Sequence, residues 1–303
     1  MSLSALASIL FNIILPIVLV AGAGFVLART LDVDTRSLSR VMLYFFTPAL
    51  LFGSAYQTRL SREYITIGIF AVVITALMGL VTWVLIRIMR YDRLTGSAFA
   101  LGVLFVNAGN YGLPLILFAF GQEGLSRAAI YFAVSAVLTQ TLAIFIASRG
   151  HANAREALLN VFKMPLMYAV ILGLALNLTG LVVPEPIMKS VDLVGGAAVP
   201  VMLTILGLEL GRATLGNDRL TISLATAAKL VLTPLMAFPL AALFGLTGVG
   251  RAVSIIEASM PTAVMASIVA VEFDVRPRLV TGIVFASTII SIVTLTILLA
   301  ILQ

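Results

Sequence analysis

Polar clusters divide the chain into ten apolar segments, and this pattern constrains the fold more than any single motif. The segments cover residues 6–28, 38–57, 64–86, 97–120, 127–148, 157–180, 187–210, 220–245, 252–271 and 279–302. Each is close to the ~20 residues that an α-helix needs to cross ~30 Å of hydrocarbon. Backbone polar groups find no water inside a bilayer, so such a chain folds into spanning helices. The sequence predicts an all-α integral membrane protein with ten transmembrane helices.

Composition excludes most kinds of enzyme site. The 303 residues are 61% hydrophobic and 11% charged, whereas a soluble domain averages about 25% charged residues. There is no cysteine, which excludes disulfides and thiolate metal sites, and the one histidine, His151, lies in a polar stretch. No P-loop is present. We therefore expect no enzyme activity, no cofactor and no metal site, and the net charge of +6, scattered over short loops, does not indicate a nucleic-acid partner.

The distribution of basic residues predicts the orientation in the membrane. One set of connections holds Arg29, Arg36, Arg40, Arg87, Arg90, Arg93, Arg149, Arg155, Lys163, Arg212, Arg219, Arg276 and Arg278, and the opposite set holds only Arg59, Arg62, Arg127, Lys189 and Arg251. Because cytoplasmic loops carry the excess of Lys and Arg, the first set is predicted to be cytoplasmic. Both termini then lie outside a multi-pass protein of the inner (plasma) membrane. The first four residues contain no Lys or Arg, so we expect the first segment to be a permanent helix rather than a signal peptide.

The two halves of the chain resemble each other in sequence. Leu10–Pro16 matches Leu159–Pro165, Thr47–Leu51 matches Val199–Leu203, and Ile130–Ala133 matches Ile283–Ala286. These matches predict a first repeat of five helices at 1–148, a short cytoplasmic connection at 149–156 and a second repeat at 157–303. Because five is odd, the second repeat must be inverted relative to the first. Inverted repeats are typical of secondary transporters, with the substrate site near the middle of the bilayer.

Two of the ten segments contain a break. The fourth reads Asn107-Ala-Gly-Asn-Tyr-Gly-Leu-Pro114, and the ninth reads Glu257-Ala-Ser-Met-Pro261-Thr-Ala-Val-Met-Ala-Ser267. Proline removes a backbone donor, and irregular backbone at this depth is tolerated only where protein or a cavity covers it. The half-helix after such a break presents free N–H groups to an anion. The predicted substrate-binding residues are Asn107, Gly109, Asn110, Tyr111, Gly112 and Pro114 in the first break and Ser259, Pro261 and Thr262 in the second. We interpret Pro16, Pro48, Pro165, Pro200, Pro234 and Pro239 as kinks or packing features.

Three further polar residues fall inside predicted helices. Lys229 lies ten residues beyond Arg219, about 15 Å along the helix, which is too deep for its side chain to reach water unaided. Intramembrane charges usually face a cavity or a partner. Lys229 and Glu257 are therefore candidates for anion binding and proton coupling, or for an ion pair with each other. Gln140 is a candidate cavity residue, with interhelical hydrogen bonding as its alternative.

The sequence resembles the auxin efflux carrier family, which includes the plant PIN proteins and bacterial transporters. The resemblance rests on Asn107–Leu115, on Pro261 and on Glu272–Ala286, the last being the more specific stretch. It implies a PIN-like fold, related to that of bile-acid symporters, in which helices 4 and 9 cross at their breaks. Helices 1, 2, 6 and 7 (about 6–57 and 157–210) would form a scaffold, and helices 3–5 and 8–10 a transport domain. The implied function is efflux of small organic anions by an elevator-type motion, with Asn107 contacting the substrate carboxylate.

Three departures separate this chain from the plant members. Val106 replaces a proline, Thr262 replaces a glutamine, and only about fifteen residues, 148–162, stand in place of the long loop between helices 5 and 6. A bacterial-type carrier of a small carboxylate is therefore the more economical interpretation than an auxin carrier. The alternative is a Na⁺- or H⁺-coupled symporter or antiporter of the bile-acid or sodium–proton type. The expected partners are the organic anion, the lipid bilayer and a second copy bound through the scaffold helices.

Overall fold

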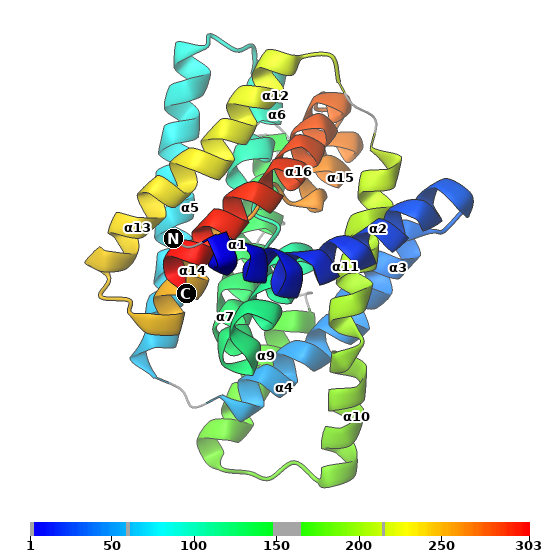
Figure 1. Ribbon diagram of the computed structural model, residues 1–303, viewed down its shortest axis with the longest axis vertical. Coiled ribbons are helices and arrows are strands. Elements are labelled where there is room, and N and C mark those ends of the chain that lie inside the picture. The colour runs from blue at the N-terminus through cyan, green and yellow to red at the C-terminus, as the bar shows by residue number, and fades with distance from the viewer. Residues whose placement is uncertain (1–2, 59–60, 148–164, 214–215) are drawn as a thin grey trace.

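The computed structural model describes residues 3–58, 61–147, 165–213 and 216–303, and these fold almost entirely into helices (Figure 1). The first half contains α1 (Leu3–Ile9), η1 (Leu10–Ile14), α2 (Leu15–Thr30), α3 (Thr35–Val41), η2 (Met42–Phe46), α4 (Thr47–Gln57), α5 (Arg62–Ile88), α6 (Arg93–Leu104), η3 (Ala108–Gly112) and α7 (Leu113–Ala147). The second half contains α9 (Pro165–Thr179), α10 (Glu185–Gly196), α11 (Ala198–Arg212), α12 (Arg219–Ala227), η4 (Ala228–Leu232), α13 (Thr233–Leu243), α14 (Gly248–Ala258), α15 (Val264–Glu272) and α16 (Pro277–Leu302). Elements labelled η are single π-helical turns.

The prediction of a helical membrane protein is confirmed. In the described part of the chain, seven helices are long and apolar enough to cross a membrane, namely Leu6–Thr30, Thr35–Gln57, Arg62–Ile88, Ala108–Ala147, Glu185–Arg212, Arg219–Leu243 and Pro277–Leu302. The helices Arg93–Leu104 and Pro165–Thr179 are apolar but shorter. The predicted fourth and fifth segments meet at Gly121, whose φ of 62° interrupts α7. The predicted connection 149–156, His151 and all of the Leu159–Pro165 match except Pro165 lie outside the described residues.

Aspartate caps fix where three of the helices begin. The Asp34 side chain accepts hydrogen bonds from the amides of Arg36 and Ser37 at the start of α3. Asp92 and Asp218 cap α6 and α12 in the same way. These side chains satisfy first-turn amides that have no partner within the helix. The hydroxyl and amide of Thr95 hold the pKa of Asp92 below its ordinary value, so Asp92 is an ionised cap at neutral pH.

Four prolines each follow a π-helical turn. The turns η1, η2, η3 and η4 end two residues before Pro16, Pro48, Pro114 and Pro234, and the residue after each turn donates to the carbonyl five residues earlier. Proline has no N–H and its ring clashes with the carbonyl four residues earlier. One extra residue per turn moves that carbonyl aside while the helix continues. The expected kinks at Pro16, Pro48 and Pro234 are therefore π-helical turns.

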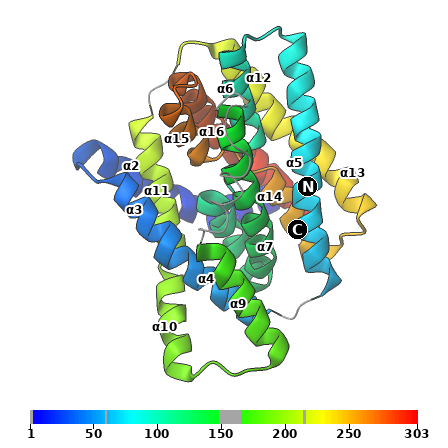
Figure 2. The same cartoon turned by 180° about the vertical axis from the view of Figure 1, so that it is seen from behind.

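The helices fall into two groups (Figures 1 and 2). In the first group, α2 packs along α11, and α4 packs against α9 and α10. In the second group, α5, α6, α7, α14 and α16 pack together, with α12 and α13 on their outer side. Hydrogen bonds link elements of the first group. The Arg212 guanidinium of α11 donates to the Thr35 hydroxyl of α3, and the Tyr56 hydroxyl of α4 accepts from the Val183 amide before α10.

The second group has polar links of its own. Arg127 of α7 forms an ion pair of 2.9 Å with Glu63 of α5, and the Tyr64 and Ser126 hydroxyls lie 3.2 Å apart. Thr221 of α12 bonds the Tyr91 hydroxyl before α6. These bonds tie together helices that are distant in sequence.

Glycines allow the first group to pack with almost no space between backbones. A Cβ on Gly207 of α11 would lie 2.7 Å from the Phe25 amide nitrogen of α2, and closer still to the Ala21 carbonyl oxygen. A Cβ on Gly173 of α9 would lie 2.8 Å from the Phe52 carbonyl oxygen of α4. In hydrocarbon, helices associate through such close van der Waals contact rather than through the hydrophobic effect.

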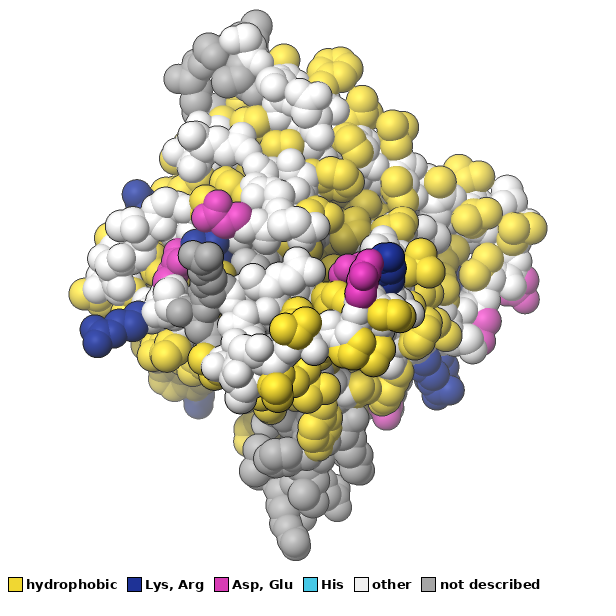
Figure 3. All heavy atoms as spheres, turned by 90° about the horizontal axis from the view of Figure 1, so that it is seen from below, with side chains coloured by type: hydrophobic (Ala, Val, Ile, Leu, Met, Phe, Trp, Pro, Cys, Tyr) yellow, Lys and Arg dark blue, Asp and Glu magenta, His cyan; other side chains and the backbone are white. Residues whose placement is uncertain are grey.

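Apolar side chains also cover much of the outer surface. In the face shown in Figure 3, hydrophobic side chains are spread widely and charged ones form a few separate groups. Exposed large side chains include Phe11, Trp83 and Leu243. In a protein that spans a bilayer, these are lipid-facing residues, and they are not evidence for a protein-binding surface.

We expect Gly207→Ala to lower the thermal unfolding temperature of the purified protein in detergent. The added methyl group meets backbone atoms that cannot rotate away, and overpacking of this kind costs about 1–3 kcal/mol. The matched control is Gly22→Ala on α2, where nothing lies within 4 Å of the added Cβ. Equal unfolding temperatures for the two variants would contradict the close packing of α2 on α11.

Candidate functional site

The two breaks predicted from the sequence lie against each other at the centre of the second helix group. The segment between α6 and η3 and the segment between α14 and α15 run antiparallel, with Val106 opposite Thr262 in an isolated β-bridge. The Asn107 amide donates to the Pro261 carbonyl at 2.8 Å, and the Ala263 amide donates to the Phe105 carbonyl at 2.9 Å. Each interrupted helix leaves backbone N–H and C=O groups without a partner, and the opposite segment supplies the partner.

Thr262 fastens this crossing through two hydrogen bonds. Its side-chain oxygen donates to the Gly102 carbonyl at 2.5 Å, and its amide donates to the Ser287 hydroxyl of α16 at 3.1 Å. Gly102 lies in the last turn of α6, where carbonyls have no partner within the helix. Thr262 is fully buried and therefore acts as a cap supplied by a distant segment. Ser259 is also buried, and its hydroxyl donates to the Ile255 carbonyl of its own helix.

A cavity of about 870 Å³, including its mouth, opens on one side of the crossing. Its wall combines residues of both helix groups: Ser39, Met42, Leu43, Val106, Asn107, Gly109, Asn110, Phe132, Ser135, Ala136, Thr139, Gln140, Leu166, Ile205, Ala263, Val264, Met265 and Ile268. Apolar side chains form most of the wall, and a few amides and hydroxyls supply its polar groups. Ligand pockets for small molecules commonly have this composition.

Asn107 is the most informative residue of the wall. Its side chain is 5% exposed, and its amide nitrogen Nδ2 is buried without a hydrogen-bond partner among the described residues. An amide nitrogen carries two donors, and leaving them unmet in a buried place costs about 1–3 kcal/mol. An acceptor bound in the cavity would satisfy them.

The start of the helix formed by η3 and α7 supplies further donors beside Asn107. The first hydrogen bonds into this helix come from the amides of Gly112 and Leu113, to Asn107 and Ala108 respectively. The amides of Gly109, Asn110 and Tyr111 therefore lie in the first turn, where helical N–H groups have no intrahelical acceptor. The helix dipole adds partial positive charge at the same point. Asn107, Gly109 and Asn110 all line the cavity at this helix end.

Two glycines let neighbouring side chains approach the backbone of this turn closely. A Cβ on Gly109 would lie 2.7 Å from the Phe132 ring, and one on Gly112 would lie 2.7 Å from Oε1 of Glu257. Gly109 therefore faces the cavity side of α7, and Gly112 faces α14. A side chain at either position would displace the Phe132 ring or the Glu257 carboxyl from its present place.

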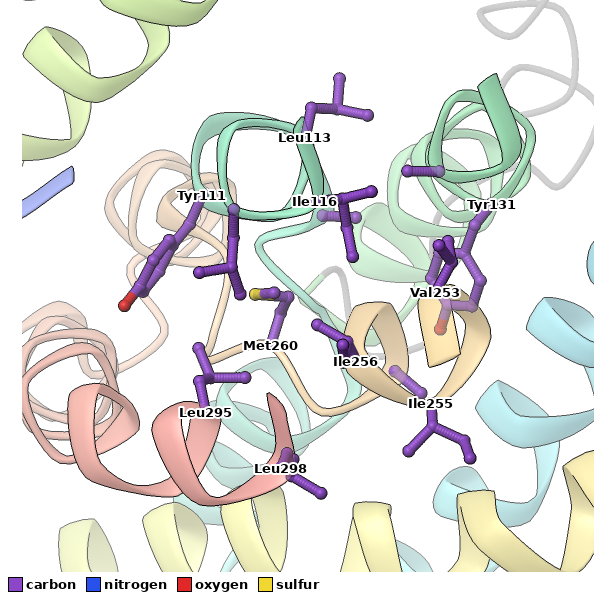
Figure 4. Close-up of a cluster of buried hydrophobic side chains, with 14 of the residues drawn as sticks. Tyr111, Leu113, Ile116, Tyr131, Val253, Ile255, Ile256, Met260, Leu295 and Leu298 are labelled. Carbon is purple, nitrogen blue, oxygen red and sulfur yellow. The ribbon is translucent and has the colours of Figure 1, made fainter. Parts of the chain in front are cut away.

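Several predicted site residues lie away from the cavity wall. Figure 4 shows Tyr111 and Met260 among buried side chains between η3, α14 and α16. Gly112, Ser259, Pro261 and Thr262 form or fasten the crossing, and Pro114 follows its π-helical turn. Of the predicted residues, the structure brings Asn107, Gly109, Asn110 and Gln140 together around the cavity.

The structure adds residues that the sequence interpretation missed. Ser39 and Met42 come from the second predicted helix, and Phe132, Ser135 and Thr139 from the fifth. Ser135 and Thr139 are four residues apart, so they share one helix face with Phe132. Two hydroxyl residues four positions apart in an apolar helix are the sequence signal that could have identified this cavity-facing side of the helix.

The two intramembrane charges are separate from each other. Lys229, 1% exposed, lies in η4, which packs against α6 and α16. Glu257, fully buried, lies against Gly112 of η3. The ion pairs of the described residues do not include one between them. The alternative that they pair with each other is therefore wrong, and neither lines the cavity.

The comparisons with known proteins decide the family. Residues 9–299 match the family described as "Membrane transport protein". The chain belongs to this family, the auxin efflux carriers. It is therefore a multi-pass membrane transporter and not a member of an enzyme family.

Relatives match over nearly the whole chain. A protein of Methanothermobacter thermautotrophicus named "Uncharacterized transporter" is 28% identical, over 97% of this chain and 94% of its own length. Another protein of that description, from Methanocaldococcus jannaschii, is 24% identical over 93% and 94%. A protein of Rhizobium meliloti named "Putative malonate transporter" is 23% identical over 94% and 93%.

We expect Thr262→Val to destabilise the protein by about 1–3 kcal/mol, since it leaves the buried Gly102 carbonyl without its side-chain donor. Thermal unfolding in detergent would measure the change. Thr75→Val on α5 is the matched control, because that hydroxyl only bonds the Ala71 carbonyl of its own helix. Thr262→Ser should retain most of the stability, and a Thr262→Val protein as stable as the control would contradict the capping role.

Proposed function

We propose that the protein is a secondary carrier of small organic anions, with the carboxylate bound at the crossing beside Asn107. The observation that carries the proposal is the buried, unpartnered Asn107 Nδ2 at the N-terminal end of a helix that opens on a cavity. Amide donors and partial positive charge suit a carboxylate. The apolar remainder of the wall suits the hydrocarbon part of an organic acid. The name of the Rhizobium relative points to the same chemical class.

The proposed architecture has ten crossings arranged as two inverted repeats of five. The two breaks would be equivalent positions of the repeats, which run in opposite directions, and their antiparallel pairing supports this. The α6 and α14–α15 helices, too short to count as spans alone, would complete the fourth and ninth crossings.

We further propose an elevator-type motion between the two helix groups. The first group would be the scaffold, and the second would carry the crossing and the substrate. The polar links described above, Arg212 to Thr35 within the first group and Arg127 to Glu63 within the second, support two internally rigid bodies. The cavity lies between the groups, since Ser39 and Ile205 come from one and Asn107 and Gln140 from the other. A homodimer through the scaffold helices remains a prediction, testable by mass photometry in nanodiscs.

Na⁺-coupled symport or antiport is the second candidate function. No group of three or more His, Cys, Asp or Glu side chains in the described residues could hold a metal ion. A Na⁺ site built from hydroxyl and carbonyl oxygens would instead show itself as Na⁺-dependent substrate binding. Thermal-shift measurements with malonate, acetate and succinate, with and without Na⁺, separate the two candidates.

We expect Asn107→Ala to reduce anion counterflow in proteoliposomes by about tenfold or more. A hydrogen bond to a charged group contributes about 1.5–3 kcal/mol, and about 1.4 kcal/mol corresponds to a factor of ten. Asn12→Ala is the matched control, because that side chain is exposed on η1 and bonds only Ser8. Unchanged counterflow in a folded Asn107→Ala protein would remove Asn107 from the substrate site.

The proposed orientation, with both termini outside, has a direct test because the chain contains no cysteine. Asn217→Cys and Thr247→Cys each place one thiol at an exposed position between helices. In intact cells, a membrane-impermeant maleimide should label Thr247→Cys only, and both variants should react after permeabilisation. Labelling of Asn217→Cys alone in intact cells would reverse the orientation.

A further inference from the structure

Glu257 is the acidic residue that the proposed anion site leaves unexplained. Its side chain is fully buried, and both carboxyl oxygens lack a hydrogen-bond partner among the described residues. An ionised carboxylate buried without partners is among the most costly groups in a protein interior, and such a group is normally neutral. In this conformation the Glu257 carboxyl therefore fits a protonated acid.

The surroundings of Glu257 supply no opposite charge. The elements packed on α14 are α5, α7, α13, α16 and η3. Tyr131 of α7 faces Glu257, and Tyr111 lies on η3. The remaining ionisable groups of these elements are Arg62, Glu63 and Tyr64 at the start of α5, Arg87 at its far end, Glu123 and Arg127 of α7, and Arg278 at the far end of α16. Glu63 lies against Gly250, about 10 Å along α14 from Glu257. The Glu63–Arg127 pair therefore lies beside the first turn of α14, far from Glu257. The titratable neighbour of Glu257 is Tyr131.

Gly112 connects Glu257 to the anion site. The carboxyl group lies against the Cα of Gly112, where any side chain would collide with it. The Gly112 amide donates to the Asn107 carbonyl at 3.0 Å, so the carboxyl lies against a residue one helical turn from Asn107. A negative charge on Glu257 would repel an anion bound beside Asn107, because charges interact strongly in a medium of low dielectric constant. A proton on Glu257 removes that repulsion.

We propose that Glu257 is the proton-binding site that couples anion movement to a proton gradient. The inference rests on the proposed anion site. One proton binds the Glu257 carboxylate as the anion binds beside Asn107, both cross together, and the proton returns to water on the far side. Because Glu257 has no access to water in this conformation, proton exchange requires the surrounding helices to move.

The test compares exchange with gradient-driven accumulation in proteoliposomes, with labelled malonate as the probe. Wild-type protein should catalyse malonate counterflow at equal pH and should accumulate malonate when the trans side is made alkaline. Glu257→Gln, which stays neutral, should retain exchange but lose at least about tenfold of the accumulation that the pH gradient drives. Glu185→Gln is the control, because this exposed carboxylate on α10 pairs with Lys189 at the surface, away from the crossing.

The possible outcomes separate the two proposals. If wild-type protein gives no counterflow with malonate, acetate or succinate, the proposed function fails, and this inference fails with it. If counterflow occurs but Glu257→Gln still follows the pH gradient like the control, this inference alone is overturned. In case Glu257→Gln does not fold, a pH dye inside wild-type vesicles gives a second measurement. Malonate entry should carry protons into the lumen with it, and entry without proton movement would also overturn the inference.

Discussion

The structure depends on one short piece of antiparallel backbone pairing, between Val106 and Thr262. Two helices are interrupted in the interior of a membrane protein, where an unpaired backbone group costs several kcal/mol. Each break supplies what the other lacks: Pro261, which has no N–H, accepts from Asn107, and Ala263 donates to Phe105. The crossing and the cavity at its side follow from this exchange. Neither break is stable without the other, so the first and second halves of the chain must assemble together.

Prolines create irregular backbone at several depths, and the chain deals with them in two ways. Where Pro16, Pro48 and Pro234 occur, a π-helical turn absorbs the disturbance and the helix continues. Where Pro261 occurs, the helix stops and the free groups bond to a distant segment. Pro114 combines both, because its π-helical turn begins directly at the break. The first break also places the polar side chains of Asn107 and Asn110 on the cavity wall.

The helical membrane fold and the two breaks could be predicted from the sequence, because hydrophobic length and proline chemistry act locally. Asn107, Gly109 and Asn110, predicted from the first break, line the cavity together with Gln140, which the sequence suggested only as a candidate cavity residue. Ser259 and Thr262 were expected at the substrate, yet the Ser259 hydroxyl bonds a carbonyl of its own helix and Thr262 fastens the crossing. Which face of a broken segment meets the cavity depends on how two distant segments cross, and periodicity does not encode this. The contributions of Ser39 and Ile205 depend likewise on how the two helix groups sit against each other.

The polar contacts described here have an energetic consequence for movement. Hydrogen bonds and ion pairs such as Arg212 to Thr35, Glu63 to Arg127 and Thr262 to Gly102 each join helices of one group. Across the cavity, the groups meet largely through side chains such as Met42, Ile205, Phe132 and Ile268. Apolar surfaces can exchange one set of dispersion contacts for another at little net cost, because each contact is individually weak. The boundary between the groups is therefore a surface along which sliding breaks few strong bonds, and the barrier to transport would come mainly from carrying the bound ions across.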